Sequence, residues 1–208
     1  MSKRPSEAQG PHVVLLVAAR RGLLFLQKVA ENTKNCHGNY FVCVKNIYRV
    51  DLTESLIRVL QFKKTPEGVE FLKFSESIAT SEMLQLGILS GKHSRFAKDC
   101  SFPHSKFEKL YSTWVQNSVS RKRKAADNVI VAKDNELIVG MVTMKMHREE
   151  RRVSIELLAV SELHQRRGIG KALVVAVYKW AMEQGAVKCT VATQQANKDA
   201  CALYESCG

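Results

Sequence analysis

One segment of the sequence, Gln165-Arg-Arg-Gly168-Ile-Gly170, has the residue types of a phosphate-binding turn. A run typical of a strand, Ser154 to Val160, precedes it, and a run typical of a helix follows it. Glycines let the backbone turn tightly and approach a ligand closely, and the unpaired N–H groups at a helix start attract anions. Because Arg166, Arg167 and Lys171 add positive charge at the same place, the segment predicts a pyrophosphate-binding turn. An ordinary tight turn between a strand and a helix has the same pattern and stays the alternative.

A second motif follows the turn further along the chain. Asn197 and Tyr204 are i and i+7 on a predicted helix, so they lie two turns apart on one face. The alternative for Asn197 is a plain helix cap. The alternative for Tyr204 is a core position on an apolar face, beside Ala200, Leu203 and Cys207.

The residues around these motifs predict an antiparallel meander, followed by a helix, a strand and a last helix. Polar turns join the strands of the meander, and Gly185 closes the first helix. A dinucleotide-binding unit would place its glycines after the first strand of a parallel sheet, which does not fit this order. We expect Val153, Ile155 and Leu157 to face one way, with Glu156 opposite. The expected strands are Asn128–Ala132, Leu137–Met146, Arg152–Val160 and Val187–Ala192, and the expected helices are Gly168–Gln184 and Asn197–Cys207.

The patterns before residue 125 are weaker. Apolar residues at the spacing of one amphipathic helix are Phe107, Leu110, Tyr111 and Trp114. We expect this helix to begin after Pro103, with Ser105 as its cap. The basic run Ser120–Lys124 predicts a solvated loop, with a nuclear signal or a nucleic-acid patch as alternatives. Further upstream we expect strands at Val13–Val17 and Tyr40–Val44 and helices at Leu52–Leu60 and Ser81–Leu89.

The composition is that of a soluble globular protein, with 45% hydrophobic and 25% charged residues among 208. The longest apolar stretch, Val13 to Leu26, contains two arginines and no signal-peptide cleavage pattern, so we expect a cytoplasmic protein without a membrane span. Six cysteines without CxxC pairs predict free thiols and no metal site. A formal charge of +12 attracts anions, which leaves nucleic acid, an acidic membrane and a phosphate-rich small molecule open.

The turn and the downstream motif together resemble the GNAT superfamily of N-acetyltransferases, whose acetyl-CoA signature is Gln/Arg-x-x-Gly-x-Gly/Ala. Gln165, Gly168 and Gly170 match that signature, and the segment Asn197–Tyr204 matches Asn-x-x-Ala-x-x-x-Tyr. The strand at Ile155–Val160 is also typical of the family, and the resemblance covers residues 125–208. It implies an α+β fold with a mostly antiparallel central sheet flanked by helices, preceded by a smaller N-terminal α/β region.

A narrower resemblance reaches further upstream. It is to the branch that acetylates the 4-amino group of a TDP-linked 4-amino-4,6-dideoxyhexose, the dTDP-fucosamine acetyltransferases. The residues that carry it are His93, Ser94, Arg95, Phe96, Asp99, Phe102, Pro103, Phe107, Leu110, Tyr111, Trp114 and Ser118. That branch has a variable region before its GNAT core. We therefore expect a disordered leader at residues 1–10, an N-terminal region without an assigned role at 11–95 and the acetyltransferase domain at 96–208.

The resemblance implies a role for each candidate residue. The expected acetyl-CoA contacts are Leu158, Ala159, Val160, His164, Gln165, Arg166, Arg167, Gly168, Ile169, Gly170, Lys171 and Asn197. Backbone N–H groups near Leu158 to Val160 would stabilise the oxyanion. Tyr204 would be the general acid that protonates the departing thiolate. Glu156 would accept the proton of the amine through water, and the alternative for it is an exposed strand carboxylate without a catalytic role.

The sequence departs from the family pattern at its end. The family continues past the Tyr-x-x-x-Gly position with a Phe and two further strands, whereas this sequence ends at Gly208. We therefore expect the last strand of the sheet to have an exposed edge. A fragment, an impaired protein, or strands supplied by another chain would each explain this departure.

These observations predict an N-acetyltransferase that uses acetyl-CoA as acetyl donor and acts on a small-molecule amine, with a nucleotide sugar as the expected acceptor. Direct attack is expected because Cys201 and Cys207 have no partner base. The alternatives are a GNAT enzyme acting on a peptide, an amino acid or another small amine, and a non-catalytic acyl-CoA-binding module. A nucleic-acid binder ranks last, because phosphate-rich ligands already account for the basic charge. A homodimer stays open.

Overall fold

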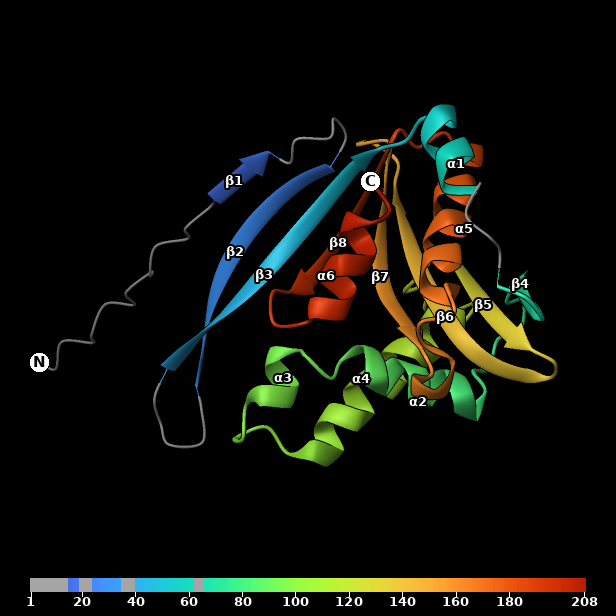
Figure 1. The fold of residues 1–208 in the computed structure, drawn as a ribbon. Helices are drawn as coiled ribbons and strands as arrows, with labels where there is room; N and C mark the ends of the chain where they lie inside the picture. Colours follow the sequence, from blue (N-terminus) through green and yellow to red (C-terminus); the bar gives the residue numbers. More distant parts are fainter. Residues whose placement is uncertain (1–14, 19–23, 35–39, 62–65) are drawn as a thin grey trace, which may run out of the picture.

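The computed structural model describes residues 15–18, 24–34, 40–61 and 66–208. Their strands form one eight-stranded sheet in the order β1-β2-β3-β8-β7-β6-β5-β4 (Figure 1). Among the described strands, β7 and β8 are the one parallel pair of neighbours, and the other pairs are antiparallel. The expected leader at residues 1–10 and the first two residues of the strand expected at Val13–Val17 lie outside the described residues.

The bounds of the elements are as follows. The strands are β1 (Leu15–Ala18), β2 (Leu24–Lys34), β3 (Tyr40–Asp51), β4 (Val69–Lys73), β5 (Asn128–Asp134), β6 (Leu137–His147), β7 (Arg152–Val160) and β8 (Lys188–Gln194). The helices are α1 (Glu54–Gln61), α2 (Ser81–Ser90), α3 (Arg95–Lys98), α4 (His104–Val119), the short 3-10 helix η1 (Glu162–His164), α5 (Ile169–Glu183) and α6 (Lys198–Glu205).

The predicted meander and the two helices after it are confirmed. Strands β5, β6 and β7 pair antiparallel in chain order. Gly185 follows the end of α5 with φ at 77°, as a glycine after a helix end does. The side chain of Asn197 caps α6 by accepting a hydrogen bond from the Ala200 N–H at 3.2 Å. The expected cap at Ser105 is wrong: α4 begins at His104 without a side-chain cap, because the fixed φ of the preceding proline already starts the helix.

Strand β8 is not an edge of the sheet. Residues 45–51 of β3 pair antiparallel with residues 188–194 of β8, and β2 continues the sheet beyond β3. Figure 1 shows β2 and β3 lying beside β8 and α6. The expectation of an exposed edge is therefore wrong, because a strand from the N-terminal part of the chain satisfies the backbone groups that the edge would leave open. The N-terminal strands and the meander share one sheet.

Helices cover both faces of the sheet. One core lies between the sheet, α5, α1 and α6, and the other lies between the sheet, α2 and α4. Strand β6 is buried on both faces, since Met141 belongs to the second core and Val142 and Met144 belong to the first. Burying one such side chain contributes roughly 1.5–3 kcal/mol. The expected α+β fold with a mostly antiparallel sheet flanked by helices is confirmed.

Strand β7 carries one extra residue at Glu156. Thr143 and Met144, which are neighbours in β6, pair with Leu157 and Ile155, so Glu156 has no partner in β6. This is a β-bulge, which bends the strand and interrupts the ladder.

The bulge also changes which face the following side chains occupy. Val153 and Ile155 pack in the core beside α5, whereas Leu157 packs in the core beside α2 and α4. The expectation that these three residues face one way is wrong, because one extra residue reverses the alternation of a strand.

The cysteines and the apolar segments add little to the site. Within the described residues, Cys189, Cys201 and Cys207 are buried free thiols, whereas Cys100 is disulfide-bonded, which differs from the expectation of free thiols throughout. No group of side chains in the described part of the chain could hold a metal ion. The search of the same residues for a helix long and apolar enough to cross a membrane also finds none.

Candidate active site

Two cavities meet where β7 and β8 part. The pairing of these parallel strands ends at Ile155 and Val191, directly before the bulge at Glu156. Beyond this point a cavity of about 410 Å³, here called the turn cavity, lies between the end of β7, the start of α5 and α6. A second cavity of about 420 Å³, here called the strand cavity, lies over β7 and β8. The two share four lining residues, Ser90, Leu158, Asn197 and Ala200, so they lie side by side.

The turn cavity contains nearly all residues that the sequence nominated for acetyl-CoA. Those that line it are Leu158, Ala159, Val160, His164, Gln165, Arg166, Gly168, Ile169, Gly170, Lys171 and Asn197. The side chain of Arg167 is not among them: its guanidinium donates to Asp134 Oδ2 at 2.9 Å and bonds to the Glu67 carbonyl at 3.5 Å. Sequence spacing did not distinguish the two neighbouring arginines, whereas the backbone of the turn points them to different sides.

The glycine turn has the backbone geometry of an anion-binding helix start. Gly168 precedes α5 with φ at 85° and no side chain caps this end of the helix. Arg166 also lies in the left-handed region, with φ at 62°. Helix starts leave their first N–H groups without intrahelical partners, and the helix dipole places partial positive charge there. Because this end opens into the turn cavity, it can hold a phosphate group.

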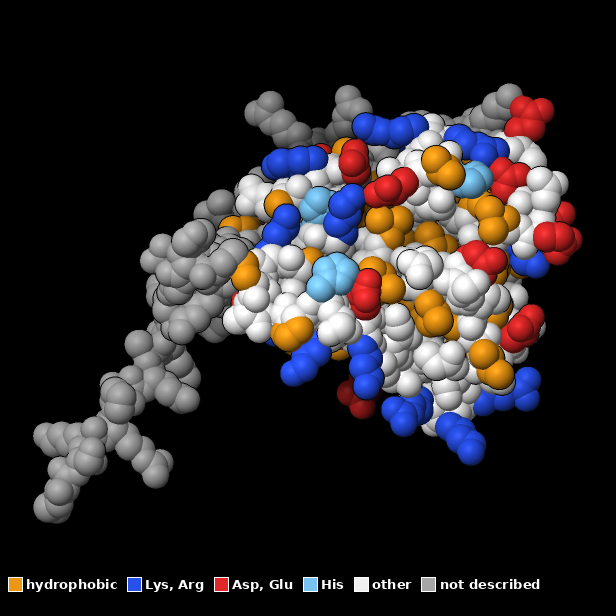
Figure 2. All heavy atoms as spheres, turned by 90° about the horizontal axis from the view of Figure 1, so that it is seen from below, with side chains coloured by type: hydrophobic (Ala, Val, Ile, Leu, Met, Phe, Trp, Pro, Cys, Tyr) orange, Lys and Arg blue, Asp and Glu red, His pale blue; other side chains and the backbone are white. Residues whose placement is uncertain are grey.

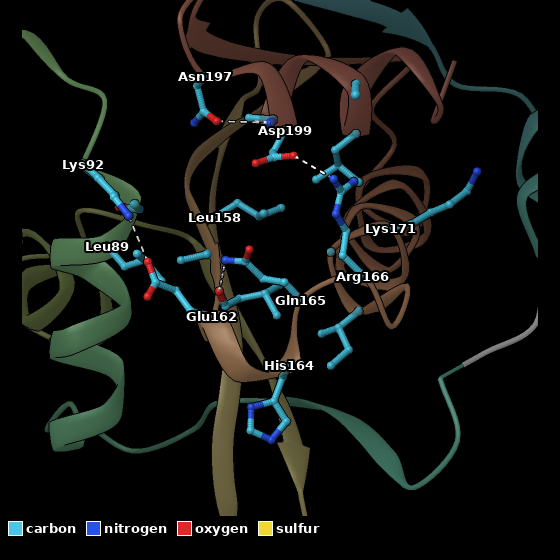
Figure 3. A pocket seen from close by; sticks show the side chains of 18 of the residues that line it. Leu89, Lys92, Leu158, Glu162, His164, Gln165, Arg166, Lys171, Asn197 and Asp199 are labelled. Carbon is cyan, nitrogen blue, oxygen red and sulfur yellow. Dashed lines mark hydrogen bonds and ion pairs between the residues drawn. The ribbon is translucent and has the colours of Figure 1, made fainter.

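Polar side chains fix the walls of the turn cavity (Figure 3). The Gln165 amide donates to the Val160 carbonyl at 3.0 Å, which ties the turn back to the end of β7. Lys171 Nζ donates to the Ser206 carbonyl at 2.8 Å. Arg166 lies 3.4 Å from Asp199, and both side chains are exposed, so solvent weakens this ion pair.

Two histidines line the same cavity. The ring of His164 lies 3.8 Å from Asp134 and 3.4 Å from the Ser161 hydroxyl. Burial, together with the positive charges of Lys98 and Lys92, lowers the pKa of His93. Since the pKa of an ordinary histidine is about 6.5, His93 is neutral at pH 7.

The strand cavity contains both residues that the sequence nominated for proton transfer. Glu156 lies at the bulge of β7, and Tyr204 comes from α6. Leu158 and Asn197, both expected acetyl-CoA contacts, also line it. Four residues of the narrower resemblance do so too, namely Arg95, Phe96, Tyr111 and Trp114 from α3 and α4. Lys45 and Ile47 from β3 complete this wall and were not predicted from the sequence. Residues 45–47 had no local signal, because their place beside β8 depends on pairing across most of the chain.

Tyr204 is 6% exposed. Burial raises the pKa of its hydroxyl, and the neighbouring Cys207, Cys189 and Cys201 raise it further. The hydroxyl therefore carries its proton at every physiological pH. The ring lies against Tyr48 of β3, with centroids 5.7 Å apart.

Glu156 accepts a hydrogen bond of 2.5 Å from the Ser154 hydroxyl. The next residue of β7, Leu157, donates its N–H to the Thr143 hydroxyl at 3.1 Å. The bulge thus holds the carboxylate at the point where β7 leaves β8, and a carboxylate held there can act as a base.

A third cavity adjoins the turn cavity on its outer side. It has a volume of about 1000 Å³ and is lined mainly by apolar residues of α2, α3 and α4. Lys92 and Glu162 line both, and they form an exposed ion pair at 2.9 Å across the boundary. Seen from below, the surface carries both positive and negative side chains, with hydrophobic ones between them (Figure 2).

Comparisons with known proteins agree on one family. The profile of the acetyltransferase (GNAT) family matches residues 94–208, and a search of curated proteins gives no match. The structure of the PaiA N-acetyltransferase from Thermoplasma acidophilum in complex with coenzyme A matches with a TM-score of 0.55 at 16% identity, over 67% of this chain and 88% of that one. A GNAT family acetyltransferase from Elizabethkingia anophelis with acetyl-CoA bound matches with a TM-score of 0.50 at 17% identity, over 68% and 76% of the two chains. At these identities the two structures are evidence for the fold.

Proposed function

Because the chain belongs to the acetyltransferase (GNAT) family, whose profile matches more than half of it, we propose that it moves an acetyl group from acetyl-CoA to a primary amine. One observation carries the proposal: the uncapped start of α5 opens into a cavity that lies beside one lined by a buried tyrosine and a bulged glutamate. The helix start is suited to binding a diphosphate, and the tyrosine and the glutamate are suited to proton transfer.

We expect the diphosphate of acetyl-CoA to lie against the backbone N–H groups at the start of α5, with Arg166 beside it. Gly170 lets the start of α5 pack closely on α6, since a Cβ added there would lie 3.3 Å from Leu203. The pantetheine arm would run past Asn197 toward the strand cavity, which shares that residue. On its β8 side, β7 has no strand partner after Ile155 within the described residues, so its backbone can pair with the arm instead.

The reaction would proceed by direct attack. Glu156 accepts a proton from the amine through water, and the amine nitrogen then attacks the thioester carbonyl. Backbone N–H groups near Leu158 to Val160 stabilise the oxyanion. The C–S bond breaks as the intermediate collapses, and Tyr204 donates its proton to the sulfur. The nitrogen still carries one proton more than the amide, and this proton passes through water to the Tyr204 phenolate, which restores the acid. Cys201 and Cys207 are buried, which is consistent with a route without an acyl-enzyme.

For the acceptor we propose a nucleotide sugar with a free 4-amino group, linked to TDP. The strand cavity supports this choice because it combines cations with aromatic rings. Lys45 and Arg95 line it together with Tyr111 and Trp114, and such groups bind phosphates and stack on bases or sugars. A peptide, an amino acid or another small amine would use the same base and acid, so these stay the alternative acceptors.

A thiol-release assay with acetyl-CoA tests the acceptor class. The panel contains a TDP-4-amino-4,6-dideoxyhexose, the same sugar nucleotide with a 4-hydroxyl, lysine peptides and an aminoglycoside. We expect release of coenzyme A with the amino sugar and none with its hydroxyl analogue. Turnover of peptides or aminoglycosides with an inert amino sugar would refute the acceptor, and a wholly inert panel would refute the enzymatic function.

A non-catalytic acyl-CoA-binding module is the alternative to an enzyme. The departure from the family pattern at the end of the sequence favours it, but that departure leaves no open edge at β8, because β3 pairs with β8. Tyr204 and Glu156 also lie in the same cavity, which a module that binds without reaction does not need.

A further inference from the structure

We propose that Ser154 and His147 form a proton path that leads from Glu156 out of the strand cavity to solvent. The inference rests on the proposed function, because it concerns the proton that the amine loses. A base that is half-buried must release each proton before the next turnover. The structure has a hydrogen-bonded chain at that place.

The chain consists of three side chains in line. The Ser154 hydroxyl bonds to Glu156 at 2.5 Å and to His147 Nε2 at 2.8 Å. Ser154 and Glu156 line the strand cavity, whereas His147 does not line that cavity. His147 is half-exposed at the last position of β6. Serine is therefore the link between a residue at the substrate and a residue at the surface.

The transfer balances in protons and charge. Glu156 takes the proton of the amine and becomes neutral. Its carboxyl then donates to Ser154 Oγ while the serine proton moves to His147 Nε2, which leaves the carboxylate and an imidazolium. The imidazolium loses its Nδ1 proton to solvent, and proton exchange with solvent then returns the ring to the tautomer whose Nε2 can accept the next proton. Histidine suits the outer position because its ordinary pKa, about 6.5, lies close to neutral pH.

Other charged side chains surround this hydrogen-bonded chain and contribute to the electrostatic potential around it. Arg152 interacts with both Glu150 and Glu156. Glu150, in turn, interacts with His147 and with Arg49 of β3. Further charged groups near the end of β6 are Asp127, which accepts from the Met146 N–H, and Lys145. The Ser154 hydroxyl is distinct from these charges, because it is hydrogen-bonded to both the Glu156 carboxylate and the His147 imidazole.

The coupling can be measured without turnover. In the full-length protein, ¹⁵N NMR reports whether Nδ1 or Nε2 of the His147 ring carries the proton, in the wild type, Glu156→Gln and Ser154→Ala. Both variants change the hydrogen-bonded chain at Ser154, so both should change the ratio of the two tautomers, and Ser154→Thr should keep the wild-type ratio. The same tautomer ratio in all four proteins would overturn the path, whatever the acceptor is found to be.

Turnover provides the second test once an acceptor is found. His147→Ala and Ser154→Ala should each lower kcat about 10-fold below pH 8, which is less than the 10²–10⁴-fold typical of a residue that transfers the proton itself. Added imidazole should restore His147→Ala but not Ser154→Ala, while Ser154→Thr should behave as the wild type. His104→Ala is the control, because the His104 side chain at the start of α4 is exposed, and this variant should keep the wild-type rate. Losses that imidazole does not restore and that leave the pH profile unchanged would indicate a structural role and refute the proposal.

Discussion

The ring of Tyr48 in β3 lies against the ring of Tyr204 in α6, with centroids 5.7 Å apart and planes at 45°. The Tyr48 hydroxyl also donates to Glu205, the neighbour of Tyr204, at 3.1 Å. A strand from the N-terminal part of the chain thus positions the residue proposed as general acid. The two aromatic rings couple the pairing of β3 with β8 to the geometry of the site.

Tyr204→Phe should lower kcat about 100-fold with little change in coenzyme A affinity, because the hydroxyl acts on the leaving sulfur and not on the bound diphosphate. Tyr178→Phe is the matched control, since Tyr178 is equally buried in α5 and lines neither cavity. Steady-state kinetics and calorimetry on both variants check this. A Tyr204→Phe enzyme with wild-type kcat would rule out the acid role.

The raised pKa of Tyr204 has a consequence for the pH profile. An ordinary tyrosine ionises near pH 10, and burial moves this ionisation of Tyr204 to higher pH. The acid should therefore stay protonated at pH 10, and kcat should not fall between pH 8 and 10 through its loss. A fall in kcat between pH 8 and 10 would contradict the assignment if the fall disappears with an acetyl donor whose leaving group needs no proton.

Gly168→Ala should lower both stability and coenzyme A affinity. The left-handed conformation of Gly168 costs an alanine about 1–2 kcal/mol, and because this strain shifts the N–H groups that begin α5, we expect about 10-fold weaker binding. Gly185→Ala is the control: its φ of 77° is similar and its Cβ would meet nothing within 4 Å. Urea unfolding should show similar losses for both variants, and calorimetry should show weaker binding for Gly168→Ala alone. If both variants bind coenzyme A as tightly as the wild type does, the turn at Gly168 does not bind the diphosphate.

Arg166→Ala and Arg167→Ala should differ in their effect on coenzyme A affinity, although the two residues are adjacent. Arg166 lines the turn cavity and its removal should weaken coenzyme A binding about 3- to 10-fold, with a smaller effect at high salt because the site is exposed. Arg167 pairs with Asp134 outside the cavity, so its removal should leave the affinity unchanged. Titrations at two salt concentrations check this. The reverse order of effects would place the diphosphate on the other side of the turn.

The local elements of the second half could be predicted because their signals are local. Residues 152–156 alternate between polar and apolar side chains, Gly185 marks a helix end, and Asn197 has the side chain of a cap. These features depend on neighbours within one or two turns. They were sufficient for the order of elements and for most residues of the turn cavity.

Long-range pairing and the bulge could not be predicted in the same way. Ile47 opposes Ala192, and nothing in either segment alone indicates that partner. Glu156 appears in the sequence as one polar residue in an alternating strand, and its place in a bulge follows from the register of β6 against β7. The acceptor side of the site therefore needed the structure, whereas the donor side did not.

The central claim is that backbone N–H groups at the start of α5 bind the diphosphate of coenzyme A. Backbone amide NMR shifts, recorded on titration with coenzyme A and with pantetheine, test it most directly. We predict that coenzyme A shifts the amides of Gly168, Ile169 and Gly170, and that pantetheine, which has no diphosphate, shifts those near Asn197 but not these three. Unmoved amides at residues 168–170 in saturating coenzyme A would contradict the account.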